Sequence, residues 1–153
     1  MHKCTIKDPV YHAEIYLFMS SYDEFCKYLK RYDSEFPNHT DYYPSGKVVR
    51  VRVTKKDFSI RKYYLWIPSF DYYGSEYKTL VHEVIHLALM VFDMKGVDNF
   101  KDNANEAFCY YADYLFGEFL KAIDKANKKI KTDNINSCRE AMDYMKEGAD
   151  GKK

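Results

Sequence analysis

The chain lacks the cysteine pairs, the long apolar runs and the excess of charge that would assign it to several broad classes of protein. Its four cysteines are widely spread and form no C-x-x-C pair, so we expect neither a disulfide framework nor a cysteine-based zinc site. No stretch approaches the roughly 20 apolar residues of a membrane span. The net charge of +1 gives no strong attraction to nucleic acid.

The first residues also lack the apolar segment of a secretory signal peptide. Together with unpaired cysteines, this leads us to expect a cytoplasmic protein that does not bind membranes. A chain of 153 residues, 46% apolar and 31% charged, can bury a core of its own. We therefore expect a single domain over residues 1–147 and a disordered tail over residues 148–153.

The pattern of apolar residues predicts a small sheet followed by helices. Residues 47–54 and 60–67 alternate or are rich in β-branched and aromatic side chains, which predicts an antiparallel hairpin with a basic, solvated outer face. Residues 63–67 of this hairpin are either a sheet edge for an extended peptide or a buried core strand. The other predicted elements are a buried strand at 13–19, helices at 21–32, 76–94, 103–125 and 137–147, and a polar Lys-rich linker or exposed helix end at 125–133.

The helix over residues 76–94 is apolar on most sides, so we expect it at the centre of the core. Ser75 is a plausible N-cap, and Lys95 followed by Gly96 is the expected stop signal. Within this helix lies the sequence His82-Glu83-Val84-Ile85-His86. Residues four apart lie on one face of a helix, so the two imidazoles can hold one zinc ion. Glu83 is then placed to take a proton from a bound water.

The competing interpretation is that these are ordinary core histidines with hydrogen-bond partners. Burying His82, His86 and the Glu83 carboxylate on an aliphatic helix is costly without a partner, and a metal ion supplies one. A catalytic zinc needs a third protein ligand. No histidine follows His86 at the required spacing. Glu106, at the start of the next helix, is the better choice, and Asp98, Asp102, Asp113 and the distant His39 are the alternatives.

The sequences HEVIH and, further on, NEA resemble the gluzincin zinc metallopeptidases, in which a glutamate is the third ligand. The small size and the order of sheet then helices are most similar to the minimal, ImmA/IrrE-type gluzincins of bacteria and phages. The resemblance covers residues 82 to about 115. It implies a zincin-like α+β fold, a small antiparallel or mixed sheet on a central HExxH helix, with His82, His86 and Glu106 as zinc ligands and Glu83 as the base.

One position departs from the thermolysin-like pattern. That pattern has an aspartate four residues after the ligand glutamate, where this chain has Tyr110. Asp113 lies one turn further on and either orients a ligand histidine or is an ordinary surface residue. The donor to the tetrahedral oxyanion is expected to be a tyrosine. The candidates are Tyr73, Tyr110, Tyr111 and Tyr114.

These patterns predict a zinc-dependent metallopeptidase that hydrolyses a peptide bond in a peptide or protein substrate. Zinc would activate a water molecule, and Glu83 would act as general base and then donate the proton to the leaving amine. The alternative is a catalytically weak or inactive zinc-binding protein, such as a phage or accessory factor, that binds a protein partner. A third hypothesis, a nucleic-acid-associated protein using the basic hairpin, is disfavoured by the charge balance.

Overall fold

The computed structural model describes residues 1–32, 45–56, 58–71, 74–97 and 104–150, with the side chains at 55, 104 and 138–150 left undescribed. The chain divides into two compact units, Met1–Ala122 and Ile123–Lys153. The first unit contains the sheet, two helices and the first part of a third helix. Of the helices in the described residues, none has the length and apolar character needed to cross a membrane.

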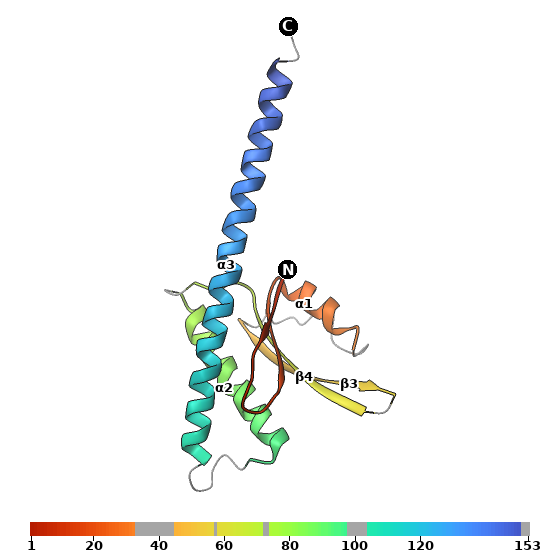
Figure 1. Ribbon diagram of the computed structural model, residues 1–153, viewed down its shortest axis with the longest axis vertical. Coiled ribbons are helices and arrows are strands. Elements are labelled where there is room, and N and C mark those ends of the chain that lie inside the picture. Colours follow the sequence, from red (N-terminus) through yellow and green to blue (C-terminus); the bar gives the residue numbers. More distant parts are fainter. Residues whose placement is uncertain (33–44, 57, 72–73, 98–103, 151–153) are drawn as a thin grey trace. The chain divides into compact units, whose positions relative to one another are not determined.

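The sheet has four strands in the order β1-β2-β4-β3 (Figure 1). These strands are β1 (His2–Ile6), β2 (Glu14–Met19), β3 (Lys47–Lys55) and β4 (Phe58–Ile67). β2 pairs in parallel with β4, whereas β1 with β2 and β3 with β4 are antiparallel. The α+β class with a mixed sheet and the β3–β4 hairpin are therefore confirmed.

Helix α1 (Tyr22–Leu29) covers one face of the sheet. Its apolar side chains join Phe18, Tyr64 and Trp66 in a buried cluster, and Val51 of β3 completes it. Ser21 begins the helix with a capping box, because its side chain accepts from the Glu24 amide while the Glu24 carboxylate accepts from the Ser21 amide. Such a cap is worth about 1 kcal/mol, which matters for a helix of eight residues.

Helix α2 (Glu76–Lys95) covers the other face, as predicted for a central helix. It buries Leu80, Val84, Leu87 and Val91, and its Met90 carbonyl accepts a bond of 3.5 Å from the Tyr63 hydroxyl of β4. The helix ends at Gly96, whose φ of 69° is the left-handed conformation that glycine adopts without strain. The predicted Ser75 cap is wrong in its detail, because Ser75 has helical backbone angles and makes no side-chain cap bond.

Helix α3 (Ala104–Asp150) is continuous over 47 residues, which corrects the predicted linker at 125–133 and the separate last helix. No proline or glycine interrupts the chain between Gly117 and Gly148, and lysine and alanine are good helix formers, so polarity alone does not end the helix. The helix also continues through residues 148–150 of the predicted tail, and residues 151–153 lie outside the described residues.

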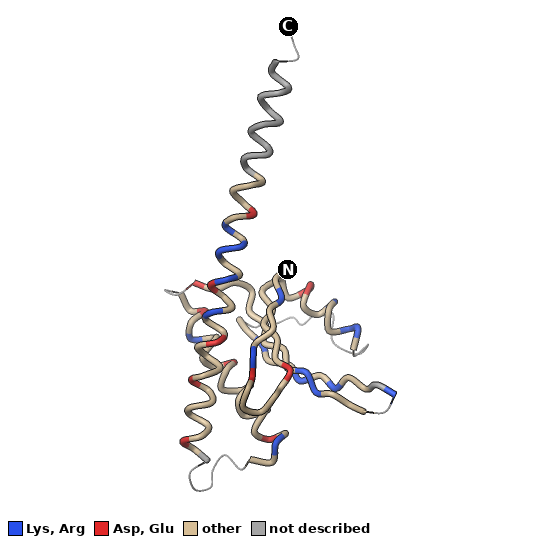
Figure 2. The backbone as a smooth tube through the Cα atoms, viewed as in Figure 1, with Lys and Arg blue, Asp and Glu red and all other residues tan. Residues whose placement is uncertain are grey.

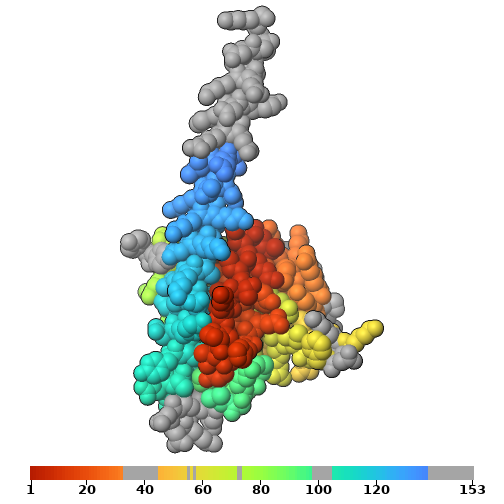
Figure 3. All heavy atoms as spheres, in the orientation of Figure 1, coloured from red at the N-terminus to blue at the C-terminus, as the bar shows by residue number. Residues whose placement is uncertain are grey.

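The first part of α3 packs beside the N-terminal strands within the first unit. The Tyr111 hydroxyl donates to Asp8 at 3.0 Å, and the Tyr114 hydroxyl donates to the Lys7 carbonyl at 3.0 Å. Figure 3 shows this face, with the N-terminal residues in red against the teal turns of α3. The strand β1 on this face was not predicted, because it buries only Ile6 and so carries no strong apolar pattern.

Candidate metal centre

The two histidines of the motif converge on one point. His82 and His86 lie one turn apart on α2, both are exposed, and their Nε2 atoms are 3.0 Å apart. Two nitrogens bound to one tetrahedral zinc at about 2.0–2.1 Å would lie about 3.3 Å apart. A small rotation of either ring makes up the difference. The two rings lie on one face of α2, as the spacing predicted, and are hydrogen-bonded to each other at a separation close to that of two ligands of one zinc ion.

Glu83 is buried between this pair and the start of β3. Its exposed fraction is 9%, and no described residue forms a hydrogen bond or ion pair with its carboxylate. The residue is buried as a whole, but its carboxylate oxygens are not among the enclosed side-chain atoms without a partner, so they keep access to solvent. A carboxylate in this position beside the histidine pair can take a proton from water.

Gly46 brings the backbone of β3 directly against Glu83. A Cβ atom at Gly46 would lie 2.5 Å from Thr79 Cγ2, 3.1 Å from Glu83 Cγ and 3.4 Å from the Trp66 carbonyl oxygen. Only glycine allows this approach. The sequence analysis did not identify Gly46 or Thr79 as neighbours of the site. The local signal that was available is the glycine placed directly before an alternating strand.

The third ligand is not assembled in the described residues, where no group of three His, Cys, Asp or Glu side chains is placed to hold a metal ion. Glu106 lies exposed in the first turn of α3 and accepts a bond of 3.1 Å from the Tyr110 hydroxyl. Of the alternatives, Asp98 and Asp102 lie outside the described residues, as does His39.

The register of α2 against α3 bears on the choice between Glu106 and Asp113. Tyr77 contacts Phe116 with ring centroids 5.4 Å apart, and Phe92 contacts Phe108 at 5.6 Å, so the two helices are antiparallel. Residues 82–86 then lie opposite the middle of this stretch of α3. Asp113 is therefore nearer than Glu106 to the level of the histidine pair.

The tyrosine candidates differ in their surroundings. Tyr111 is buried and its hydroxyl donates to Asp8, so this side chain is part of the core rather than of the site. Burial and the neighbouring Asp8 carboxylate raise the pKa of Tyr111 above its usual value. Tyr110 is 69% exposed and bonded to Glu106, and Tyr114 is bonded to the Lys7 carbonyl. Tyr73 lies outside the described residues.

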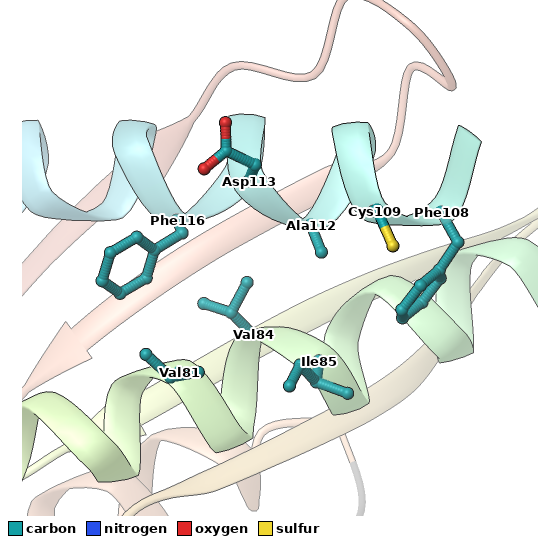
Figure 4. Close-up of a pocket in the computed structure, with 8 residues that line it drawn as sticks. All are labelled: Val81, Val84, Ile85, Phe108, Cys109, Ala112, Asp113 and Phe116. Atoms are coloured by element: carbon teal, nitrogen blue, oxygen red, sulfur yellow. The ribbon is translucent and has the colours of Figure 1, made fainter. Parts of the chain in front are cut away.

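A pocket of about 320 Å³ lies between α2 and α3, next to the motif. Val81 and Ile85, the residues that precede His82 and His86, form part of its wall (Figure 4). The Asp113 carboxylate points away from α2 in this view, while Cys109 points into the space between the helices. The complete lining is apolar apart from two side chains, and consists of Val81, Val84, Ile85, Phe108, Cys109, Ala112, Asp113 and Phe116.

Comparison of the chain with protein-family models, with curated proteins and with solved structures finds no match. The functional assignment therefore depends on the residues and their geometry.

Proposed function

We propose that this protein is a zinc-dependent peptidase whose site is formed by His82, Glu83 and His86. The observation that carries the proposal is the convergence of two imidazole nitrogens, 3.0 Å apart, beside a carboxylate that has no partner among the described residues. Hydrolysis of a peptide bond at a catalytic zinc requires three protein ligands and an adjacent general base, and these residues would supply two of the ligands and the base.

In this proposal each residue has a separate task. His82 and His86 hold the metal ion, which when bound would acidify a water molecule and polarise the carbonyl of the peptide bond. Glu83 takes the proton of the attacking water and donates it to the leaving amine. Because Glu83 is packed against Gly46, its position is held by the strand as well as by the helix.

The third ligand in the proposal is Glu106, with Asp113 as its competitor. Glu106 would have to exchange its bond to Tyr110 for the metal, and Asp113 would have to turn toward α2. In either case one carboxylate from α3 completes a His2-carboxylate set, which leaves one position open for water and substrate.

Substrate binding in the proposal uses the pocket and the edge of the sheet. The apolar pocket beside Val81 and Ile85 suits an apolar side chain of the substrate. The sheet has two edge strands, β1 and β3, and the proposal uses β3, which begins beside Glu83. β4 lies between β2 and β3, so residues 63–67 form a buried core strand. Among the described residues β3 pairs only with β4, so its other side can take an extended peptide as an additional strand.

Metal analysis of the purified protein, followed by cleavage of a mixed peptide library, tests this function. We expect one zinc ion per chain, its loss in His82→Ala and in His86→Ala, and cleavage that a chelator abolishes and added zinc restores. The absence of zinc from the wild type would refute the metal site. Zinc without cleavage would favour the alternative, a zinc-binding protein that binds a protein partner and does not cleave it. The observation that supports this alternative is that the described residues contain no assembled set of three ligands.

A further inference from the structure

The β3–β4 hairpin concentrates positive charge in a molecule that is otherwise slightly acidic. Residues 47–62 contain seven Lys or Arg residues and one Asp, a net charge of +6, whereas the whole chain has a net charge of +1. Figure 2 shows these cations in blue along both strands of the hairpin. A local excess of this size indicates an anionic partner for the hairpin.

Two of these cations oppose each other without compensation. Arg52 of β3 lies directly across from Arg61 of β4. Like charges at such a cross-strand position are destabilising. By contrast, Arg50 pairs with Asp93 at 3.1 Å, and Lys62 pairs with Glu14 at 2.9 Å. Within the described residues neither Arg52 nor Arg61 has an acidic partner, so a carboxylate from elsewhere would relieve their repulsion.

The arginine pair lies along the strand that begins at the proposed site. Gly46, against Glu83, directly precedes β3, and Arg52 is six positions further on. At about 3.4 Å per residue this separation is roughly 20 Å. An extended chain added to the side of β3 that no described strand occupies would therefore pass the site and bring residues about four to six positions away beside Arg50 and Arg52.

We infer that β3 receives an extended acidic polypeptide segment, with carboxylates at alternate positions beside Arg50 and Arg52 and with Arg61 on the next strand across from Arg52. The inference rests on the proposed peptidase function and specifies its substrate class. Alternate residues of an added strand lie on one face, which is the face that carries Arg50, Arg52 and Arg61. A peptide is favoured over nucleic acid because only a peptide backbone can pair with the side of β3 that no described strand occupies.

The test measures binding in the full-length, zinc-loaded Glu83→Gln protein, which keeps bound peptide intact. The probes are two fluorescent peptides long enough to pair with all nine residues of β3, one with Glu at alternate positions and one with Gln in their place. We expect the Glu peptide to bind about 2- to 5-fold more tightly for each carboxylate that is paired, with the preference falling at high salt.

Arg52→Gln should remove part of this preference, and Lys131→Gln, the same change of charge on an exposed residue of α3, should leave it intact. Circular dichroism checks that Arg52→Gln is folded. Equal binding of the two peptides, no binding of either, or equal effects of the two substitutions would overturn the inference. So would tighter binding of a single-stranded oligonucleotide than of the Glu peptide. The proposed function is judged separately, by zinc content and cleavage in the wild type.

Discussion

The contact between Gly46 and α2 makes Gly46→Ala the most informative substitution for the geometry of the site. The added Cβ would lie 2.5 Å from Thr79 Cγ2, about 0.9 Å short of ordinary van der Waals contact at 3.4 Å. It would also lie 3.1 Å from Glu83 Cγ. Neither neighbour can swing far, because Thr79 is β-branched and both belong to the same helix. Overpacking of this kind costs typically about 1–3 kcal/mol.

We therefore expect Gly46→Ala to lower the free energy of unfolding by about 1–3 kcal/mol in urea denaturation. Because α2 must shift at Glu83, we expect kcat to fall more than zinc affinity, since the atoms nearest the added Cβ belong to Thr79, Glu83 and Trp66 and not to the histidines. The double variant Gly46→Ala/Thr79→Ala removes the closest atom and should recover part of the loss, with a coupling energy of about 0.5–1 kcal/mol or more. A change below about 0.5 kcal/mol, or strict additivity with Thr79→Ala, would refute the close approach.

Three further predictions concern the buried tyrosine, the N-terminal lysine and the third ligand. Tyr64→Phe should raise stability by about 1 kcal/mol, because the buried hydroxyl has no partner among the described residues. Burial raises the pKa of Tyr64 in the folded protein. Below about pH 10 its hydroxyl is therefore neutral in both the folded and the unfolded protein, and above that pH it ionises first in the unfolded protein. The wild type should thus lose stability as the pH rises past about 10, and the variant should lose less. Lys3→Met should raise the pKa of Tyr28. Burial raises this pKa, but the hydrogen bond from the Lys3 ammonium and the other neighbours of Tyr28 bring it below the usual value. Ultraviolet titration at alkaline pH checks this prediction, and an unchanged titration counts against it. Of the variants Glu106→Gln and Asp113→Asn, the one that removes the third ligand should lower zinc affinity about 10-fold or more. If both variants bind zinc as tightly as the wild type, neither carboxylate is a ligand.

The elements with strong local signals could be predicted from the sequence. The alternation of Val49, Val51 and Val53 specified the hairpin, and the apolar run ending in Lys95 and Gly96 specified the central helix and its end. The spacing of the histidines was enough to predict their convergence, because four residues make about one helical turn.

The features that were missed depend on contacts between distant parts of the chain. The parallel pairing of β2 with β4 joins strands separated by α1 and β3, and the edge position of β3 follows from it. The burial of Glu83 against Gly46 likewise depends on how the sheet meets α2. The identity of the third ligand depends in the same way on the register of α3 against α2, which includes ring contacts such as Phe92 with Phe108, and Glu106 stays a prediction. The length of α3 was underestimated because the polar composition of residues 125–133 was interpreted as a linker or as the exposed end of a helix.

The most direct test of the central claim is the ratio of cleavage rates of wild-type and Glu83→Gln protein at equal, measured zinc occupancy. If Glu83 is the base beside a metal held by His82 and His86, the substitution should leave zinc bound and lower the rate by about 10²- to 10⁴-fold. Equal rates in the two proteins, or a rate that falls only because zinc is lost, would contradict the assignment.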